Sequence, residues 1–240
     1  MKVEEKQPIA IIGAMEVEVQ ALIAGLEETE RTEVAGLVFH AGRLSGRECV
    51  IAQCGPGKVN AAVCTQIIIQ AYRPSLVINV GVAGGVGVEI GDLVVASACV
   101  QHDFDTTAMG DPLGTLFIRR GEKESRGLLE LPSDEKASAV LLEAAKSIYG
   151  HAHSGVVATG DAFIADREKN RWLSEKFGAK AVEMEGGSIA QVCYMNEVPC
   201  AVLRAISDNA NDDSPQDFPA FTRECSEKTS RLLKRAIGRL

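Results

Sequence analysis

Short apolar runs alternate with segments of helical periodicity along the whole chain, and this alternation limits the fold more than any other feature of the sequence. The apolar run Ser75–Gly81 is typical of a strand in the middle of a parallel sheet, whereas Met15–Leu26 has the apolar spacing of a helix. Alternating strands and helices predict an α/β protein of three-layer α/β/α architecture, with a mixed, mainly parallel, twisted central sheet. No linker or change in composition divides the chain, so we expect one domain over residues 1–240.

Apolar spacing, together with the positions of Gly and Pro, predicts the range of each helix and strand. The expected strands are Pro8–Gly13, Val38–Gly42, Glu48–Gln53, Ser75–Gly81, Gly91–Val100, Gly155–Thr159, Ala181–Met184 and Pro199–Ile206. The expected helices are Met15–Leu26, Lys58–Tyr72, Ser133–Tyr149, Asp166–Phe177, Ser188–Met195 and Asp217–Ile237. The segment Gln101–Arg126 has no clear periodicity and contains several Gly and Pro residues, which predicts a long loop.

Charge and hydropathy narrow the class of partner. The chain has 25 Lys and Arg against 33 Asp and Glu, a net charge of −8, and such an acidic surface repels a phosphate backbone. No apolar stretch is long enough to cross a bilayer or to form the core of an export signal. We therefore expect no nucleic-acid partner, no membrane partner and a cytoplasmic location.

Cysteine and histidine usage gives no sign of a metal. The seven cysteines form no C-x-x-C pair, which indicates buried, reduced side chains. His151 and His153 form a lone H-x-H with no third ligand nearby in the sequence, so we expect no metal.

Glycines and carboxylates follow five of the expected strands. In α/β sheets, ligands bind beyond the carboxyl ends of the strands, and a buried carboxylate is costly unless it is paired or used. Taken singly, Glu16 and Glu18 also fit a helix N-terminus, Asp208 fits an N-cap and Phe163 fits a core position. The stretches concerned are Gly13–Glu18, Val82–Gly85, Gly160–Ile164, Glu183–Glu185 and Ser207–Asp208.

Together, these stretches form an ordered set of motifs. The motifs are IIGAMEVEV (11–19), GPGKVNAA (55–62), NVGVAGG (79–85), GDLVV (91–95), ATGDAFI (158–164), AVEMEGGSIAQVC (181–193) and LRAISD (203–208). In kind and order they resemble the methylthioadenosine/S-adenosylhomocysteine nucleosidases of the purine nucleoside phosphorylase-like superfamily. The resemblance covers nearly all of the chain. It implies hydrolysis of the N-glycosidic bond of a small nucleoside, in which adenine leaves and water attacks C1′, without metal or organic cofactor.

The resemblance implies a role for each residue of the reacting centre. Asp208 matches the general acid that donates toward adenine N7, and burial would favour the protonated form that this role needs. Glu18 matches the residue that positions and activates the attacking water. Ser207 and Arg204 match residues beside the acid and the water.

A second group matches the residues that hold the nucleoside. Glu185 matches the acceptor for the ribose hydroxyls, and Met184 lines the ribose. Phe163 packs on the purine, Ile164 supplies backbone hydrogen bonds to the purine edge, and Phe218 lines the same pocket. The remaining residues that we expect to contact the nucleoside are Met15, Val82, Ala83, Gly84 and Glu183.

Some positions depart from the family pattern. Val82 stands where the family often has serine near the ribose, and Pro56 replaces a more usual apolar residue of the pocket wall. The resemblance implies a homodimer in which the loop 102–110 covers the 5′-substituent pocket of the partner subunit. Thr106 and Met109 are the positions that would face this substituent, and these departures bear on the preferred 5′-group.

The first strand–helix turn favours water over phosphate as the nucleophile. It contains Glu16 and Glu18 but no Lys or Arg, and two carboxylates would repel phosphate. Three alternatives remain open: a purine nucleoside phosphorylase, a nucleosidase for another 5′-modified nucleoside such as aminodeoxyfutalosine, and a nucleoside-binding protein without activity.

Overall fold

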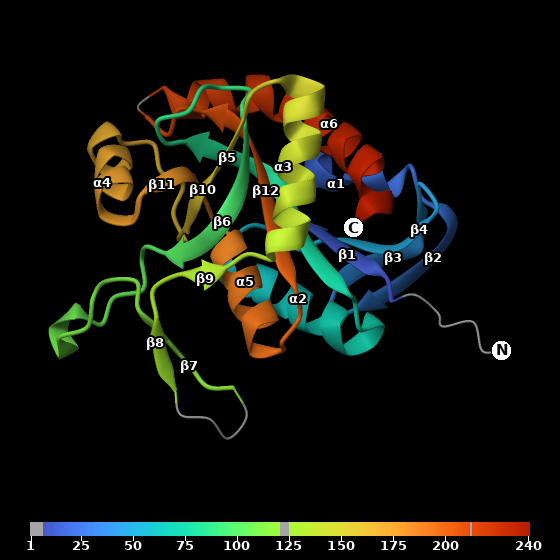
Figure 1. Cartoon of the computed structure of the whole chain (residues 1–240), viewed down its shortest axis with the longest axis horizontal. Helices are drawn as coiled ribbons and strands as arrows, with labels where there is room; N and C mark the ends of the chain where they lie inside the picture. Colours follow the sequence, from blue (N-terminus) through green and yellow to red (C-terminus); the bar gives the residue numbers. More distant parts are fainter. Residues whose placement is uncertain (1–6, 121–124, 212) are drawn as a thin grey trace.

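The computed structural model describes residues 7–120, 125–211 and 213–240 (Figure 1). The helices are α1 (Glu16–Ile23), α2 (Lys58–Tyr72), α3 (Glu135–Tyr149), α4 (Arg167–Phe177), α5 (Gly186–Met195) and α6 (Ser214–Ala236), with short 3-10 turns η1 (Thr107–Met109) and η2 (Ile237–Arg239). The strands are β1 (Ile9–Gly13), β2 (Glu27–Val34), β3 (Leu37–Leu44), β4 (Arg47–Gln53), β5 (Leu76–Gly85), β6 (Leu93–Gln101), β7 (Leu116–Ile118), β8 (Arg126–Leu128), β9 (Leu131–Pro132), β10 (Ala152–Thr159), β11 (Ala179–Glu183) and β12 (Cys200–Asp208).

The expected helices and strands all occur, and most of them have shifted ends. Lys58–Tyr72 has the expected bounds because the glycines before it and Pro74 after it stop the helix at both ends. The expected loop Gln101–Arg126 contains η1 and β7, and its residues 121–124 lie outside the described part. The prediction omitted β2, because its eight residues EETERTEV are all exposed and carry no apolar alternation.

One mixed sheet forms most of the structure, and it closes on itself. Its strand order is β11-β10-β6-β12-β5-β1-β4-β3-β2, and β11 also pairs antiparallel with β5. The strands β5, β12, β6, β10 and β11 therefore form a closed ring, from which β1 to β4 continue as an open extension. This corrects the expectation of a three-layer α/β/α architecture around a central sheet: the α/β class and the mixed sheet are confirmed, but the core is a five-stranded barrel.

Glycines allow the ring to close. The sequence predicts that this strand ends at Gly81, whereas β5 continues to Gly85. A Cβ on Gly84 would lie 2.7 Å from the Cβ of Ala210, and one on Gly85 would lie 2.8 Å from a methyl carbon of Ile206. Only a strand without side chains at these positions can pass this close to its neighbours.

Two antiparallel contacts bring together strand segments that a fully parallel sheet would keep apart. In β12, Arg204 pairs in parallel with Gly81 of β5 and antiparallel with Val94 of β6. The strand β11 runs against β5, with Val182 opposite Gly84. The carboxyl end of β11 therefore meets the second half of β5 and the middle of β12.

Two helix groups cover the sheet with separate hydrophobic cores. One core includes Cys64 of α2 and Ile189 of α5, and the other includes Leu22 of α1, Leu141 of α3 and Leu232 of α6. Figure 1 shows α2 and α5 side by side, with α1 and α6 on another side of the strands. Within the described ranges, no helix is both long enough and apolar enough to span a membrane.

Candidate functional site

The Glu18 carboxylate is held by backbone N–H groups at the start of α1. Its Oε2 accepts hydrogen bonds from the N–H groups of Ala14 and Met15, both at 2.8 Å, and its Oε1 accepts one from the N–H of Val82 at 2.9 Å. The side chain is only 4% exposed. Burial raises the pKa of Glu18 above its usual value, although nearby Arg204 and the three N–H groups act in the opposite direction.

Gly81 of β5 provides the space in which Glu18 meets Arg204. A Cβ at Gly81 would lie 2.2 Å from Nη1 of Arg204 and 2.5 Å from Oε1 of Glu18. Any side chain at this position would displace one of the two charged groups. The carboxylate and the guanidinium are therefore neighbours across the backbone of β5.

Arg204 is the central cation of this buried cluster. It is fully buried and donates hydrogen bonds to Asn79 Oδ1 and Glu183 Oε2, and its Nη2 lies 3.7 Å from Oε2 of Glu185. Burial disfavours its charge, but Glu183, Glu185 and Glu18 together raise the pKa of Arg204 above its usual value. Its Nε is buried and has no hydrogen-bond partner among the described residues.

Glu183, which ends β11, serves the structure around it. Its Oε2 accepts from the N–H groups of Glu185 at 2.9 Å and Gly186 at 2.7 Å, where α5 begins. Its Oε1 accepts from the hydroxyl of Thr159, which in turn accepts from the N–H of Gly187 at 2.6 Å. With Arg204 as a further donor, this carboxylate has its acceptor sites occupied by the protein.

Glu185 lies outside the strand and keeps more acceptor capacity. It is the residue before α5, and its Oε1 accepts from the N–H of Gly57 at 2.9 Å. Burial, and next the charge of Glu183, raises the pKa of Glu185 to about 7. Strict alternation along an extended strand would place Glu183 and Glu185 on one side, but β11 ends at Glu183 and the chain turns toward α5. Met184 lies between the two glutamates and is half-buried.

Asp208 is the last residue of β12 and is almost fully buried. Its Oδ2 accepts from the hydroxyl of Ser207 at 3.0 Å, and its Oδ1 accepts from the N–H of Ala210 at 2.8 Å. A Cβ on Gly84 would lie 3.1 Å from Oδ1 of Asp208, so this carboxyl group also lies against β5. Gly81 and Gly84 are three residues apart, roughly 10 Å along a strand, which separates the Glu18 and Asp208 contacts.

Two aromatic rings from distant segments meet at the surface. Phe163, in the loop after β10, and Phe218, in the first part of α6, pack edge to face with ring centroids 5.6 Å apart. Phe163 remains 49% exposed, which is unusual for a ring of this size with a core role. Ile164 packs against the smaller core around Val86.

Most of the other residues that we expect to contact the nucleoside lie in β5 or at the start of α1. Val82, Ala83 and Gly84 are buried in β5, and the half-buried Met15 packs against both larger cores. Thr106 and Met109 do not join them: they lie around η1, in a segment that projects from the body in Figure 1, and Met109 is 82% exposed.

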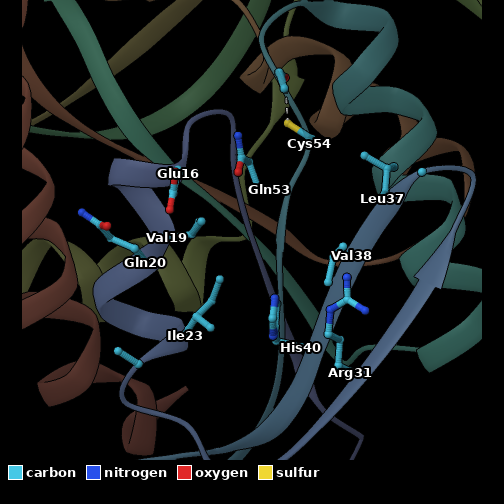
Figure 2. Close-up of a pocket in the computed structure, with 13 residues that line it drawn as sticks. Glu16, Val19, Gln20, Ile23, Arg31, Leu37, Val38, His40, Gln53 and Cys54 are labelled. Atoms are coloured by element: carbon cyan, nitrogen blue, oxygen red, sulfur yellow. Dashed lines mark hydrogen bonds between the residues drawn. The ribbon is translucent and has the colours of Figure 1, made fainter.

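The two glutamates of the first turn separate. Glu18 faces Arg204, whereas Glu16 lines a cavity of about 670 Å³ between α1 and the β2–β3 hairpin. Figure 2 shows this cavity, with His40 and Arg31 on the hairpin side. Neither Asp208 nor Glu185 lines it, so this cavity is distinct from the carboxylate cluster.

The sequence analysis did not assign four groups that the structure connects to the site: Asn79, Gly81, Thr159 and the N–H of Gly57. Their signals lay inside motifs already noted, NVGVAGG, ATGDAFI and GPGKVNAA. For Asn79, Thr159 and the N–H of Gly57, the signal is a polar group without a partner close in the sequence. For Gly81, the signal is a glycine inside an apolar strand, which marks a close approach of other groups.

Comparison with known proteins identifies relatives of the whole chain. A family described as the Phosphorylase superfamily matches residues 8–238. A 5′-methylthioadenosine/S-adenosylhomocysteine nucleosidase of Shewanella loihica is 41% identical over 221 residues, covering 89% of this chain and 91% of the relative.

Two solved structures are similar over nearly the full length. The nucleosidase of the same description from Neisseria meningitidis, in complex with methylthio-immucillin-A, has a TM-score of 0.90 and 31% identity, covering 98% of this chain and 100% of the other. A futalosine hydrolase of Helicobacter pylori has a TM-score of 0.88 and 35% identity, covering 98% of each chain.

Proposed function

The chain belongs to the phosphorylase superfamily and, within it, to the 5′-methylthioadenosine/S-adenosylhomocysteine nucleosidases, and on this premise we propose that it hydrolyses the N-glycosidic bond of 5′-methylthioadenosine, S-adenosylhomocysteine and related 5′-substituted adenosines, releasing adenine.

The hydrogen-bond partners of Glu18 support water, rather than phosphate, as the nucleophile. The N–H groups of Ala14, Met15 and Val82 converge at the start of α1, an arrangement that elsewhere binds anions such as phosphate. Here they bind the protein's own carboxylate. Because a phosphate would lose these donors and face a like charge, the site suits a neutral nucleophile.

Glu18 is proposed to take the proton of the attacking water. Its raised pKa makes it a stronger base than an ordinary glutamate, and the three N–H groups keep its orientation fixed. Arg204 lies beside it across Gly81, and its positive charge offsets part of the negative charge of Glu18, Glu183 and Glu185.

Asp208 is proposed to protonate the leaving purine at N7. In the balanced step, water adds its oxygen to C1′, the C1′–N9 bond breaks, and adenine leaves with a proton from Asp208 while Glu18 receives one from the water. Ser207 orients the carboxyl group through its hydroxyl, and Gly84 lets it lie close to β5.

Glu185 and the aromatic pair are proposed to hold the two halves of the substrate. Glu185 keeps acceptor capacity for ribose hydroxyls, whereas Glu183 is occupied by its own N–H and hydroxyl donors. Phe163 and Phe218 offer ring surface for the purine, and the exposure of Phe163 supports this role. Met184, between the two glutamates, would contact the ribose.

A homodimer is proposed as the active form. The proposal follows from the family resemblance, and large apolar side chains that are exposed on α2, α5 and the segment after β6 are compatible with it. They are Val59, Val63, Met109, Phe117 and Met195. Thr106 and Met109 would then reach the 5′-group bound by the partner subunit. Light scattering should give the mass of two chains, and a fully active monomer would contradict this proposal.

A reducing compartment such as the cytoplasm fits the cysteines. All seven are free and buried in the structure, as expected from the lack of a C-x-x-C pair in the sequence.

The decisive assay for the reaction is adenine release from 5′-methylthioadenosine in phosphate-free buffer, repeated with added phosphate. We expect equal release in both buffers, with 5-methylthioribose as the second product. Release that required phosphate would contradict the role of Glu18 and identify a phosphorylase. Adenine binding without any release would favour a binding protein.

Hydrolysis of a 5′-modified nucleoside of the futalosine type is the second candidate. The similarity to the Helicobacter pylori futalosine hydrolase favours it. Comparing kcat/KM for methylthioadenosine, S-adenosylhomocysteine and aminodeoxyfutalosine separates the two, because all three present the same adenosine to the described carboxylates.

A further inference from the structure

Three segments that are far apart in the sequence are tied together at the start of α2. The backbone N–H of Lys58 donates to Oδ1 of Asp161 at 2.8 Å, and its ammonium group donates to Oδ1 of Asp103 at 2.7 Å. Lys58 begins α2, Asp103 follows β6 and Asp161 follows β10. The roles proposed above for Glu18, Glu185 and Asp208 do not involve these contacts.

Asp103 also contacts Asp161, so that Lys58, Asp103 and Asp161 each contact the other two and form one cluster. Its second oxygen, Oδ2, accepts from the backbone N–H of Asp161 at 2.8 Å. Burial alone would raise the pKa of Asp103, but the Lys58 ammonium and the Asp161 N–H lower it below its usual value. The side chains of Lys58 and Asp103 are 19% and 29% exposed, so solvent screens this pair less than an ordinary surface ion pair.

The cluster of Lys58, Asp103 and Asp161 lies next to proposed substrate contacts on both sides. Gly57, directly before Lys58, donates its N–H to Glu185 at 2.9 Å. Phe163 follows Asp161 by two residues, in the same loop. The ring of the neighbouring His102 packs on the backbone of Gly160, where a Cβ would lie 2.4 Å from Nε2. The Phe163 loop is therefore held by Asp103 and by His102 together.

We propose that Lys58 is a positioning residue for nucleoside binding: with Asp103 and Asp161 it sets the distance between Glu185, which holds the ribose, and the Phe163 loop, which holds the purine. This inference rests on the proposed function. A nucleoside spans both contacts, whereas free adenine occupies only the purine side. Loss of the Lys58 ammonium should therefore weaken the nucleoside more than adenine.

The test compares Lys58→Met, Lys58→Arg and Asp103→Asn with the wild type. In phosphate-free buffer we measure kcat and KM for 5′-methylthioadenosine, the inhibition constant of adenine, and Tm. We expect Lys58→Met to lower kcat/KM roughly tenfold, mainly through KM, with a smaller change for adenine. Lys58→Arg should restore part of the loss, and the double variant Lys58→Met/Asp103→Asn should lose little more than either single variant.

A matched control removes an ion pair far from the site. Arg239→Met breaks the 2.7 Å contact between Arg239 and Glu143 on α3, and its kcat/KM should equal that of the wild type. A Lys58→Met enzyme with a lower Tm but unchanged kcat/KM would overturn the proposal, as would equal losses for nucleoside and adenine.

Failure of the proposed function is separable from failure of this inference. If the wild type releases no adenine, hydrogen exchange still tests the cluster, because the N–H of Asp161 is donated to Asp103. Faster exchange at Asp161 in Asp103→Asn together with weaker adenosine binding by Lys58→Met would support the positioning role. Unchanged exchange and binding would overturn it.

Discussion

At the scale of single residues, the site separates carboxylates that look alike in the sequence. Glu183 accepts from two N–H groups, one hydroxyl and Arg204, so its role is to hold α5 and the guanidinium in place. Glu185 has one N–H partner, and Asp208 has one N–H and one hydroxyl. The carboxylates with remaining acceptor or donor capacity are the ones proposed to meet the substrate.

The first residue-scale prediction concerns the general acid. Asp208→Asn should fold normally, because the amide oxygen can still accept from the N–H of Ala210. It should reduce kcat by roughly 10²–10⁴ since an amide cannot protonate the purine, while adenine still binds. Turnover and adenine affinity are measured side by side. Near-normal turnover would remove Asp208 from the proposed role.

The second residue-scale prediction concerns the pH dependence of kcat/KM. The pKa of Glu185 is about 7, and the charged form is the better acceptor for ribose hydroxyls. Glu183, Arg204, Glu18 and the N–H of Gly57 are the groups that act on this pKa. We therefore expect kcat/KM to fall as the pH is lowered through about 7. In Glu185→Gln, this fall of kcat/KM at acidic pH should disappear. If the fall persists in the variant, another group is responsible for it.

At the scale of elements, β5 organises the site. Glu18 lies against Gly81 and Val82, and Asp208 lies against Gly84, so one strand sets the spacing between proposed base and acid. The strand can do this because its glycines admit side chains from α1, β11 and β12 right up to the backbone.

The element-scale prediction tests this packing. Gly81→Ala should lower kcat/KM by roughly 10²-fold and destabilise the fold by about 1–3 kcal/mol, because its Cβ would meet both Glu18 and Arg204. Gly238→Ala is the matched control, since a Cβ there meets nothing within 4 Å. Kinetics and thermal unfolding of both variants check the prediction, and a fully active Gly81→Ala enzyme would contradict the described geometry.

At the scale of the whole molecule, the buried carboxylates of the candidate site lower the stability of the fold when they are charged. Glu18 and Glu185 are buried with raised pKa values, so the folded state binds their protons more tightly than the unfolded chain does. The stability linked to these protons is present below the unfolded pKa and is lost as the pH rises through the folded pKa. The overall charge of −8 acts in the same direction, because acidification reduces self-repulsion.

The whole-molecule prediction follows from this sign. Tm should be higher at pH 6 than at pH 8, since the folded pKa of Glu185 is about 7. Glu185→Gln should raise Tm at pH 8 and flatten the dependence while impairing nucleoside binding. Differential scanning calorimetry across this range measures both effects. A Tm that rises with pH would mean that other groups outweigh the buried carboxylates.

The sequence by itself determined most of the local elements and which acids follow strands, whereas the roles of Glu18, Glu185 and Asp208 come from the family resemblance and stay predictions. Helical spacing, Gly57 and Pro74 were enough to bound α2, and strand-end acids marked Glu18, Glu185 and Asp208, because these signals depend only on neighbouring residues. The edge strand β2 was missed because it buries no face.

Only the tertiary structure decided how these pieces meet. The pairing of β11 with β5 closes the ring, and this closure brings Glu183 to Arg204. The start of α5 brings Glu185 to the N–H of Gly57. The Lys58 contacts join residues 45 and 103 positions apart in the sequence. Sequence periodicity gives the face of a strand but not its partner or direction, so long-range contacts of this kind depend on how the whole core packs.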